Sequence, residues 1–225
     1  MGKFGNILCS FYMAWSRFGS FPGLIVTFLS CSSIVFGVQY SAIKYADLDH
    51  DGRIETIDVD SERPSALEIR RNRKLLWSGV SSDWKPWKLE IADVDGDGKP
   101  EIVLGVFKST KFFPQPHNCL FIYNWAGDHA YPKWLGSSLA RPFTDFLFAA
   151  LDEQPGTELF AVETSLDGRK SIGAYRWNGF GFTLERRTGD WHTAKILGSQ
   201  DGQISVEADG EHLVVSAKTG ARHEK

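Results

Sequence analysis

The sequence contains few of the groups that usually carry chemistry. It has three cysteines, too few for a disulfide framework, and Cys119 lies alone in an apolar run where a small buried side chain is expected. None of the six histidines forms a His-x-x-x-His pair. There is also no Gly-x-Ser-x-Gly, no glycine-rich phosphate loop and no Cys-x-x-Cys. These absences leave no positive evidence for an enzyme.

An excess of charge of one sign is also missing. The 25 Lys and Arg residues nearly balance the 28 Asp and Glu residues, which leaves a formal net charge of −3. Nucleic-acid binders usually carry a larger basic field, so no nucleic-acid partner is expected. The local basic group Arg70, Arg71, Arg73 and Lys74 is interpreted as a solvated strand face.

The abundant residues favour strands and tight turns. The chain has 16 Phe, 8 Trp and 22 Gly, and its hydrophobic content of 42% is ordinary for a globular protein. Aromatic residues favour β-strands, and frequent glycine favours the turns between them. The composition therefore predicts one all-β domain or a small repeat array.

Acidic residues are absent from the N-terminal segment, residues 1–46. Lys3 and Arg17 precede a charge-free run over 20–42, of which about eighteen residues are mostly apolar. That length suits a long signal peptide or a short membrane anchor, and the basic residues before it would direct the remainder outward. We therefore expect 1–37 to be a signal peptide or an anchor, and the rest of the chain to be exported.

The type of targeting segment stays open. Phe28-Leu29-Ser30-Cys31 resembles a bacterial lipobox, which would make Cys31 a lipidation site, although Phe28 stands where Leu is usual. A cleaved signal, an uncleaved anchor and a lipoprotein signal are all compatible with this run. A buried first strand or helix is the remaining alternative. Export to the cell envelope or beyond is the favoured interpretation.

Three features recur in the same order along the chain. The first is an acidic loop that opens a strand, at Asp47, at Asp93 and in a degenerate copy at Asp152. Each loop is followed by a strand ending in Trp-x-Gly and, after a turn, by another Trp. The Trp-x-Gly copies are Trp77-Ser78-Gly79, Trp125-Ala126-Gly127 and Trp177-Asn178-Gly179, and the later tryptophans are Trp84, Trp134 and Trp191.

This repeat predicts an all-β, β-propeller-like array of about four blades over 38–220, followed by a tail over 221–225. Periods of about 40–50 residues with several short strands are typical of propeller blades. The glycine of each Trp-x-Gly is expected to supply a positive φ in a hairpin. Four blades result if Val38–Tyr45 provides the strand that completes the last one. A closed ring and an open array both remain possible.

The two complete acidic loops have the spacing of a cation site. Carboxylates at positions 1, 3 and 5 of a loop that turns through glycine converge on one centre, position 7 offers a carbonyl and position 9 another carboxylate. A hard divalent cation removes their mutual repulsion, and Ca²⁺ tolerates irregular oxygen ligands better than Mg²⁺. The expected ligands are Asp47, Asp49, Asp51, Arg53 (carbonyl) and Glu55, and then Asp93, Asp95, Asp97, Lys99 (carbonyl) and Glu101.

An EF-hand begins with the same Asp-x-Asp-x-Asp-Gly. It also requires an acid at position 12 and a helix on either side. Position 12 is Asp58 in the first loop but Leu104 in the second, and both loops continue into β-branched runs typical of strands. The second loop therefore excludes an EF-hand.

The segments ADLDHDGRIE (46–55) and ADVDGDGKPEIVLGV (92–106) resemble the calcium-binding repeats called FG-GAP or VCBS repeats. Such repeats occur in integrin α-subunit propellers and in many bacterial surface proteins. The resemblance covers roughly residues 40–190 and implies the same two sets of Ca²⁺ ligands. The third copy keeps Asp152 and Glu158 but has Ala150 and Gln154 where acids belong, which leaves a third ion open.

Exposed aromatic residues are the only candidates for contact with a partner. Trp84, Trp87, Phe112 and Phe113 lie in turn-rich stretches, where they could stack on sugar rings or grip a peptide. Core packing is the alternative, above all for the tryptophans.

Three functions fit these observations. The first is a non-catalytic, calcium-stabilised module of the cell envelope or exterior that binds a protein or a glycan. The second is an accessory or catalytic domain of a polysaccharide-acting enzyme, which acids and aromatics gathered in one groove would favour. The third is a purely structural envelope protein.

Overall fold

The computed structural model describes residues 39–150, 152, 154–200, 202–216 and 220–223. The expected signal or anchor segment, with Cys31, lies outside the described residues. In the part of the chain that the structure describes, no helix is long and apolar enough to cross a membrane.

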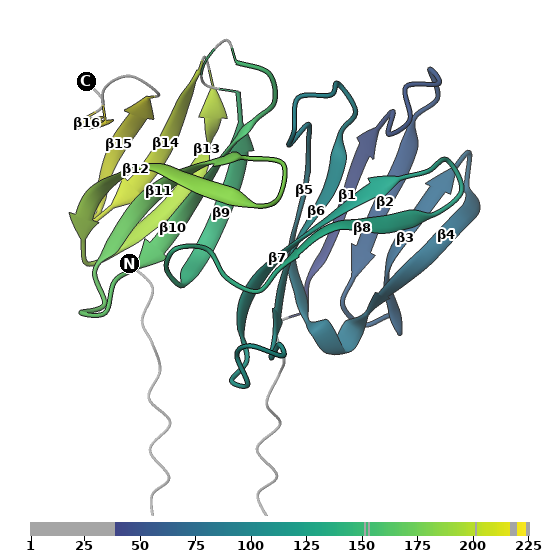
Figure 1. Cartoon of the computed structure of the whole chain (residues 1–225), viewed down its shortest axis with the longest axis horizontal. Coiled ribbons are helices and arrows are strands. Elements are labelled where there is room, and N and C mark those ends of the chain that lie inside the picture. The colour runs from purple at the N-terminus through teal and green to yellow at the C-terminus, as the bar shows by residue number, and fades with distance from the viewer. Residues whose placement is uncertain (1–38, 151, 153, 201, 217–219, 224–225) are drawn as a thin grey trace, which may run out of the picture. The chain divides into compact units, whose positions relative to one another are not determined.

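The described residues form four antiparallel sheets, each built from four strands that are consecutive in sequence (Figure 1). The sheets are arranged as a four-blade β-propeller, which confirms the predicted fold class. A short 3₁₀ helix, η1 (Ser82–Trp84), links the first two sheets. The strands are β1 (Ser41–Ala46), β2 (Glu55–Asp60), β3 (Ser65–Arg71), β4 (Lys74–Ser81), β5 (Pro86–Ala92), β6 (Glu101–Lys108), β7 (His117–Trp125), β8 (Ala130–Gly136), β9 (Phe143–Ala149), β10 (Glu158–Thr164), β11 (Lys170–Trp177), β12 (Phe182–Trp191), β13 (Ala194–Gln200), β14 (Gln203–Ala208), β15 (Glu211–Ser216) and β16 (Gly220–His223).

The hydrophobic pattern of each second strand shows how its sheet is packed. In β2 and β14 buried residues alternate with more exposed ones, as expected for a sheet with one buried face. In β6 the run Glu101–Val106 is buried throughout, and in β10 only the last residue is not. A strand buried on both faces reads as a continuous apolar run. The two middle sheets are therefore covered on both sides.

Three hydrophobic clusters connect neighbouring sheets. One packs Ile57 and Ile69 of the first sheet against Leu104 of the second. Another joins the second sheet to the third, and the last joins the third to the fourth through residues such as Phe160 and Val206. Among the described residues, no cluster combines the first sheet with the fourth.

The strand order gives the sheets two ends with different loops. We call the end that carries loops 47–54 and 93–100 the acidic end; these loops connect β1 to β2 and β5 to β6. The opposite end carries loop 109–116, between β6 and β7, and connection 137–142, between β8 and β9. The acidic end holds the two metal-type clusters described below, and the opposite end holds a cavity.

Two expectations about the repeats were wrong. The first concerned Val38–Tyr45: β1 belongs to the first sheet, and β16 completes the fourth sheet by pairing with β15. The second concerned Trp-x-Gly. Gly127 and Gly179 have φ near +90°, as expected, but Gly79 lies inside β4, where a Cβ would come within 2.4 Å of the Trp77 ring. In the first sheet, the turn between β3 and β4 has its positive φ angles at Asn72 and Arg73.

Candidate metal centres

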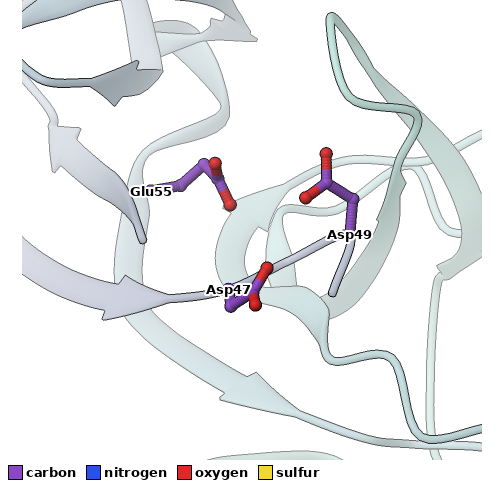
Figure 2. Close-up of side chains that lie close together, drawn as sticks. All are labelled: Asp47, Asp49 and Glu55. Carbon is purple, nitrogen blue, oxygen red and sulfur yellow. The ribbon is translucent and has the colours of Figure 1, made fainter. Parts of the chain in front are cut away.

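The first acidic loop brings three carboxylates together. Asp47 follows β1 directly, Asp49 lies two residues further on, and Glu55 is the first residue of β2. One ligand oxygen from each lies within 4.8 Å of the other two (Figure 2). Because Glu55 is fully buried and the two aspartates are half-buried, this cluster sits at the edge of the core.

Backbone hydrogen bonds hold this loop in place. The carboxylate of Asp47 accepts from the N–H groups of Asp51, at 3.1 Å, and Gly52, at 2.9 Å. Oε2 of Glu55 accepts from the N–H of Leu48 at 3.0 Å. Gly52 has φ of +82°, a conformation that glycine adopts without strain. The sequence thus builds the loop around its own acids.

The second acidic loop repeats this construction. Asp93, Asp95 and Glu101 bring their ligand atoms within 4.8 Å of one another. Glu101 accepts from the N–H of Val94 at 2.8 Å, and Asp93 accepts from Gly96 and Gly98. Burial raises the pKa of Glu101, although the hydrogen bond from a nearby lysine opposes that rise.

The predicted position-5 ligands, Asp51 and Asp97, are not among the three acids of either cluster. The carboxylate of Asp51 accepts from the backbone N–H and from Nε of Arg53, both at 2.9 Å, and this side-chain bond lowers the pKa of Asp51. Asp97 accepts from the N–H of Lys99 at 2.7 Å. Positions 1, 3 and 9 are therefore the ones that the structure brings together.

Each cluster also contacts a basic side chain of the protein itself. In the first, Nε of Arg71 lies 2.5 Å from Oε1 of Glu55, and the guanidinium lies 3.4 Å from Asp49. Burial lowers the pKa of Arg71, but its hydrogen bond to Glu55 and the nearby negative charges outweigh this, so the pKa is raised. Interpreting Arg71 as part of a solvated strand face was wrong, because its side chain is only 14% exposed.

Lys133 has this role in the second cluster. Its ammonium lies 2.5 Å from Oε1 of Glu101 and also pairs with Asp95. Burial lowers the pKa of Lys133, but its hydrogen bonds to the two acids raise it overall. Lys133 comes from β8, whereas Arg71 comes from β3.

The third, degenerate acidic loop also pairs its acids with a basic side chain, but it has fewer acids. Arg176 lies 2.8 Å from Asp152 and 3.4 Å from Glu158. The ladders explain the likeness, because Thr56 pairs with Arg70 and Leu159 with Tyr175, which places Arg71 and Arg176 at matching positions. Among the described residues, no group of three metal-ligating side chains forms here.

The aromatic candidates divide into two groups. Trp84 packs edge-on against Phe121 at 5.4 Å, and Trp87 packs against Phe146 at 5.5 Å, so both tryptophans contribute to the core. Phe112 and Phe113 are 78% and 45% exposed, in loop 109–116 at the opposite end. The structure does not bring these four residues together with the acids.

The charges of the clusters fit a divalent cation. Carboxylates about 4.8 Å apart repel by roughly 3.5 kcal/mol per pair at an effective dielectric of about 20. In the first loop, four carboxylates meet two guanidinium groups, which leaves two negative charges uncompensated. The donors are all oxygens, which hard cations prefer. Both clusters could hold a metal ion.

Comparisons with known proteins neither support nor oppose a metal site at these clusters, so the candidate sites rest on the residues described above. The likeness to FG-GAP or VCBS repeats remains a prediction from the two loops. A scan against protein-family models gives no match, and a search of curated proteins finds no similar sequence.

Proposed function

We propose that the propeller is a non-catalytic module, stabilised by Ca²⁺, that binds a protein or a glycan at the cell envelope or outside the cell. The observation that carries the proposal is the pair of three-carboxylate clusters at the acidic end. Each joins the end of one strand to the start of the next, which is where a bound ion adds stability. The export of the module rests on the N-terminal segment alone.

Ca²⁺ is the proposed ion because the clusters are irregular. Each offers three converging carboxylates, and the position-5 aspartate and position-7 carbonyl of the same loop are the further oxygen ligands that the proposal assigns to the ion. Ca²⁺ accepts six to eight oxygen ligands in flexible geometry, whereas Mg²⁺ demands a near-ideal octahedron. Arg71 and Lys133 partly compensate the acids without an ion, and they would have to release Glu55 and Glu101 in part for a cation to gain those ligands.

A second function, acting on polysaccharide, is favoured by one hollow. A space of about 280 Å³ over the second cluster is lined by Asp95, Glu101 and Lys133 together with Trp125 and Tyr131. Tyr131 is 42% exposed and could stack on a sugar ring. Binding or cleavage of oligosaccharides that is lost in Tyr131→Ala would favour this second function.

Thermal unfolding with calcium, with magnesium and with a chelator tests the main proposal. At ten times the dissociation constant each site adds about 1.4 kcal/mol, so two sites should raise Tm by roughly 5–10 °C. The shift should shrink in Asp95→Ala, vanish in Asp49→Ala/Asp95→Ala, and persist in Asp83→Ala, which changes an exposed aspartate in η1.

The outcomes are separable. An unchanged Tm in the wild type would refute ion binding. A full calcium-dependent rise of Tm in the double variant would show that the ion binds elsewhere than at these clusters. An equal shift with magnesium would refute the preference for Ca²⁺.

A further inference from the structure

A cavity of about 540 Å³ lies at the opposite end, between loop 109–116 and connection 137–142. Small-molecule sites typically enclose about 300–1,000 Å³ and are mostly apolar, with a few polar groups that set orientation. This cavity has that character. Its apolar lining includes Phe113, Pro114, Pro116, Leu139 and Phe143.

Hydrogen bonds between the two walls hold the cavity open. The ring nitrogens of His117 lie 2.9 Å from the carbonyl oxygen of Gln115 and 2.5 Å from that of Ser137, so this ring joins the two segments. Nδ2 of Asn118 donates to the carbonyl oxygen of Phe143 at 2.8 Å. The site is therefore largely formed before any ligand arrives.

Arg141 is the charged group of this lining. It is half-buried, and in the part of the chain that the structure describes it has no ion pair or hydrogen bond. Its neighbour Arg169, by contrast, pairs with Asp190 at 3.0 Å. The described lining of the apolar cavity contains no carboxylate. Arg141 also lines an adjoining hollow with Asp167 and Asp190 but forms no ion pair with either in the described structure, so its charge is left for a ligand to compensate.

We propose that this cavity binds a small amphipathic carboxylate, with an aromatic or aliphatic body against Phe113, Leu139 and Phe143 and its carboxylate on Arg141. A guanidinium matches a carboxylate with two parallel hydrogen bonds, and such charge-assisted bonds are the strong ones. A cation or an uncharged sugar would leave Arg141 unpaired. A polyphosphate would need more donors than this lining offers.

The site goes beyond the proposed function and is independent of it. The acidic clusters lie at the other end of the strands, so removing their ions leaves these residues untouched. Failure of the calcium experiment would leave the cavity unaffected, and the reverse also holds.

A pair of fluorescent probes tests the proposal on the full chain. The anion 8-anilinonaphthalene-1-sulfonate and the uncharged N-phenyl-1-naphthylamine share a ring system and differ in the negative charge. The wild type should bind the anion more tightly than the uncharged probe. Octanoate should displace the anion, and octanol should do so much less well.

Matched variants assign the binding to this cavity. Arg141→Met should weaken anion binding by at least about tenfold, because a single charge-assisted hydrogen bond already has that effect, and should leave the uncharged probe nearly unchanged. Arg169→Met removes the same charge from a side chain outside the apolar lining and should have little effect. Phe113→Ala should weaken both probes, and Phe112→Ala, outside the lining, should weaken neither.

Two results would overturn the proposal. One is equal affinity for the anion in the wild type and in Arg141→Met. The other is equal affinity of the wild type for the two probes. The apolar segment before residue 38 is common to all variants, so probe bound there cancels in these comparisons. Circular dichroism of each variant shows that the fold is retained.

Discussion

The guanidinium of Arg71 donates from Nε to Oε1 of Glu55 at 2.5 Å, and the same group lies 3.2 Å from Asp51. A positive charge of the chain itself therefore lies against the carboxylates that would ligate a metal ion. Lys133 contacts Asp95 and Glu101 in the second loop in the same way. The chain cation and the proposed metal ion would share these oxygens, so they would compete for them.

Replacing Arg71 by methionine should raise the affinity of the first loop for Ca²⁺ and lower the stability of the protein without Ca²⁺. The charge that opposes a divalent cation is removed, so Ca²⁺ affinity at the first loop should rise by about tenfold or more. With a chelator, the melting temperature should fall, because the acids then repel one another without compensation. Isothermal titration in Asp95→Ala, where only the first loop binds, measures the affinity.

Arg73→Met is the control for this prediction. Arg73 is exposed and lies in the turn between β3 and β4, two residues after Arg71. Equal Ca²⁺ affinities of the two variants would contradict the competition between Arg71 and the bound ion.

Glycines of the two acidic loops should differ in their tolerance of alanine. Gly96 has φ of +77°, and a Cβ there would come within 2.6 Å of Pro155 in the third loop. Gly52 has φ of +82° with nothing within 4 Å. Both changes incur about 1–2 kcal/mol of backbone strain, and Gly96→Ala should lose more. Urea unfolding of both variants measures this, and equal losses would show that the contact with the third loop does not matter.

Glu163 holds a buried polar cluster at the far end of β10. It is fully buried and contacts the hydroxyl of Tyr175 and Nε of Arg187. Glu163→Gln removes the negative charge that pairs with Arg187 and should reduce the free energy of unfolding by roughly 3 kcal/mol. The exposed Glu62→Gln should change it little. A loss no larger than that of the control, measured by denaturant unfolding, would contradict this role of the ion pair.

The fold should lose stability at alkaline pH through Tyr123. Burial raises the pKa of Tyr123 to about 12 from the ordinary value of 10. Between these values the unfolded chain releases the proton while the fold retains it, so stability falls as pH rises from 10 to 12. A shift of two units corresponds to about 2.7 kcal/mol.

Tyr123→Phe should flatten this part of the pH–stability curve. Burial also raises the pKa values of Tyr40 and Tyr175, so some alkaline loss should remain. The exposed Tyr131→Phe is the control and should leave the curve unchanged. An unaltered slope in Tyr123→Phe would contradict the assignment.

Local sequence patterns were enough for the fold class and for part of the metal clusters. The acidic loops encode positions 1, 3 and 9 within nine residues, and the hydrogen bonds from Leu48 and Val94 to the position-9 glutamates are equally local. The blade number followed from the three repeats and the tail, although the strand assigned to complete the last blade was wrong.

Contacts across strands could not be predicted in this way. Arg71 reaches Glu55 only because of the register of β2 on β3, in which Thr56 pairs with Arg70. Lys133 reaches Glu101 from a strand 32 positions later in the chain. The cavity forms between segments 109–116 and 137–142, which share no sequence pattern.

Because the three hydrophobic clusters join adjacent sheets, the cooperativity of unfolding depends on the packing between neighbouring sheets. Each sheet is stabilised by the one beside it, as in proteins built from stacked repeats. Within the described residues, the first and fourth sheets each contribute to one cluster only, so their amides should exchange with deuterium through partial openings. The middle sheets should exchange only when the whole domain opens. The chain therefore opens inward from both ends, and the packing between the two middle sheets, beside which the cavity lies, is the last to be lost.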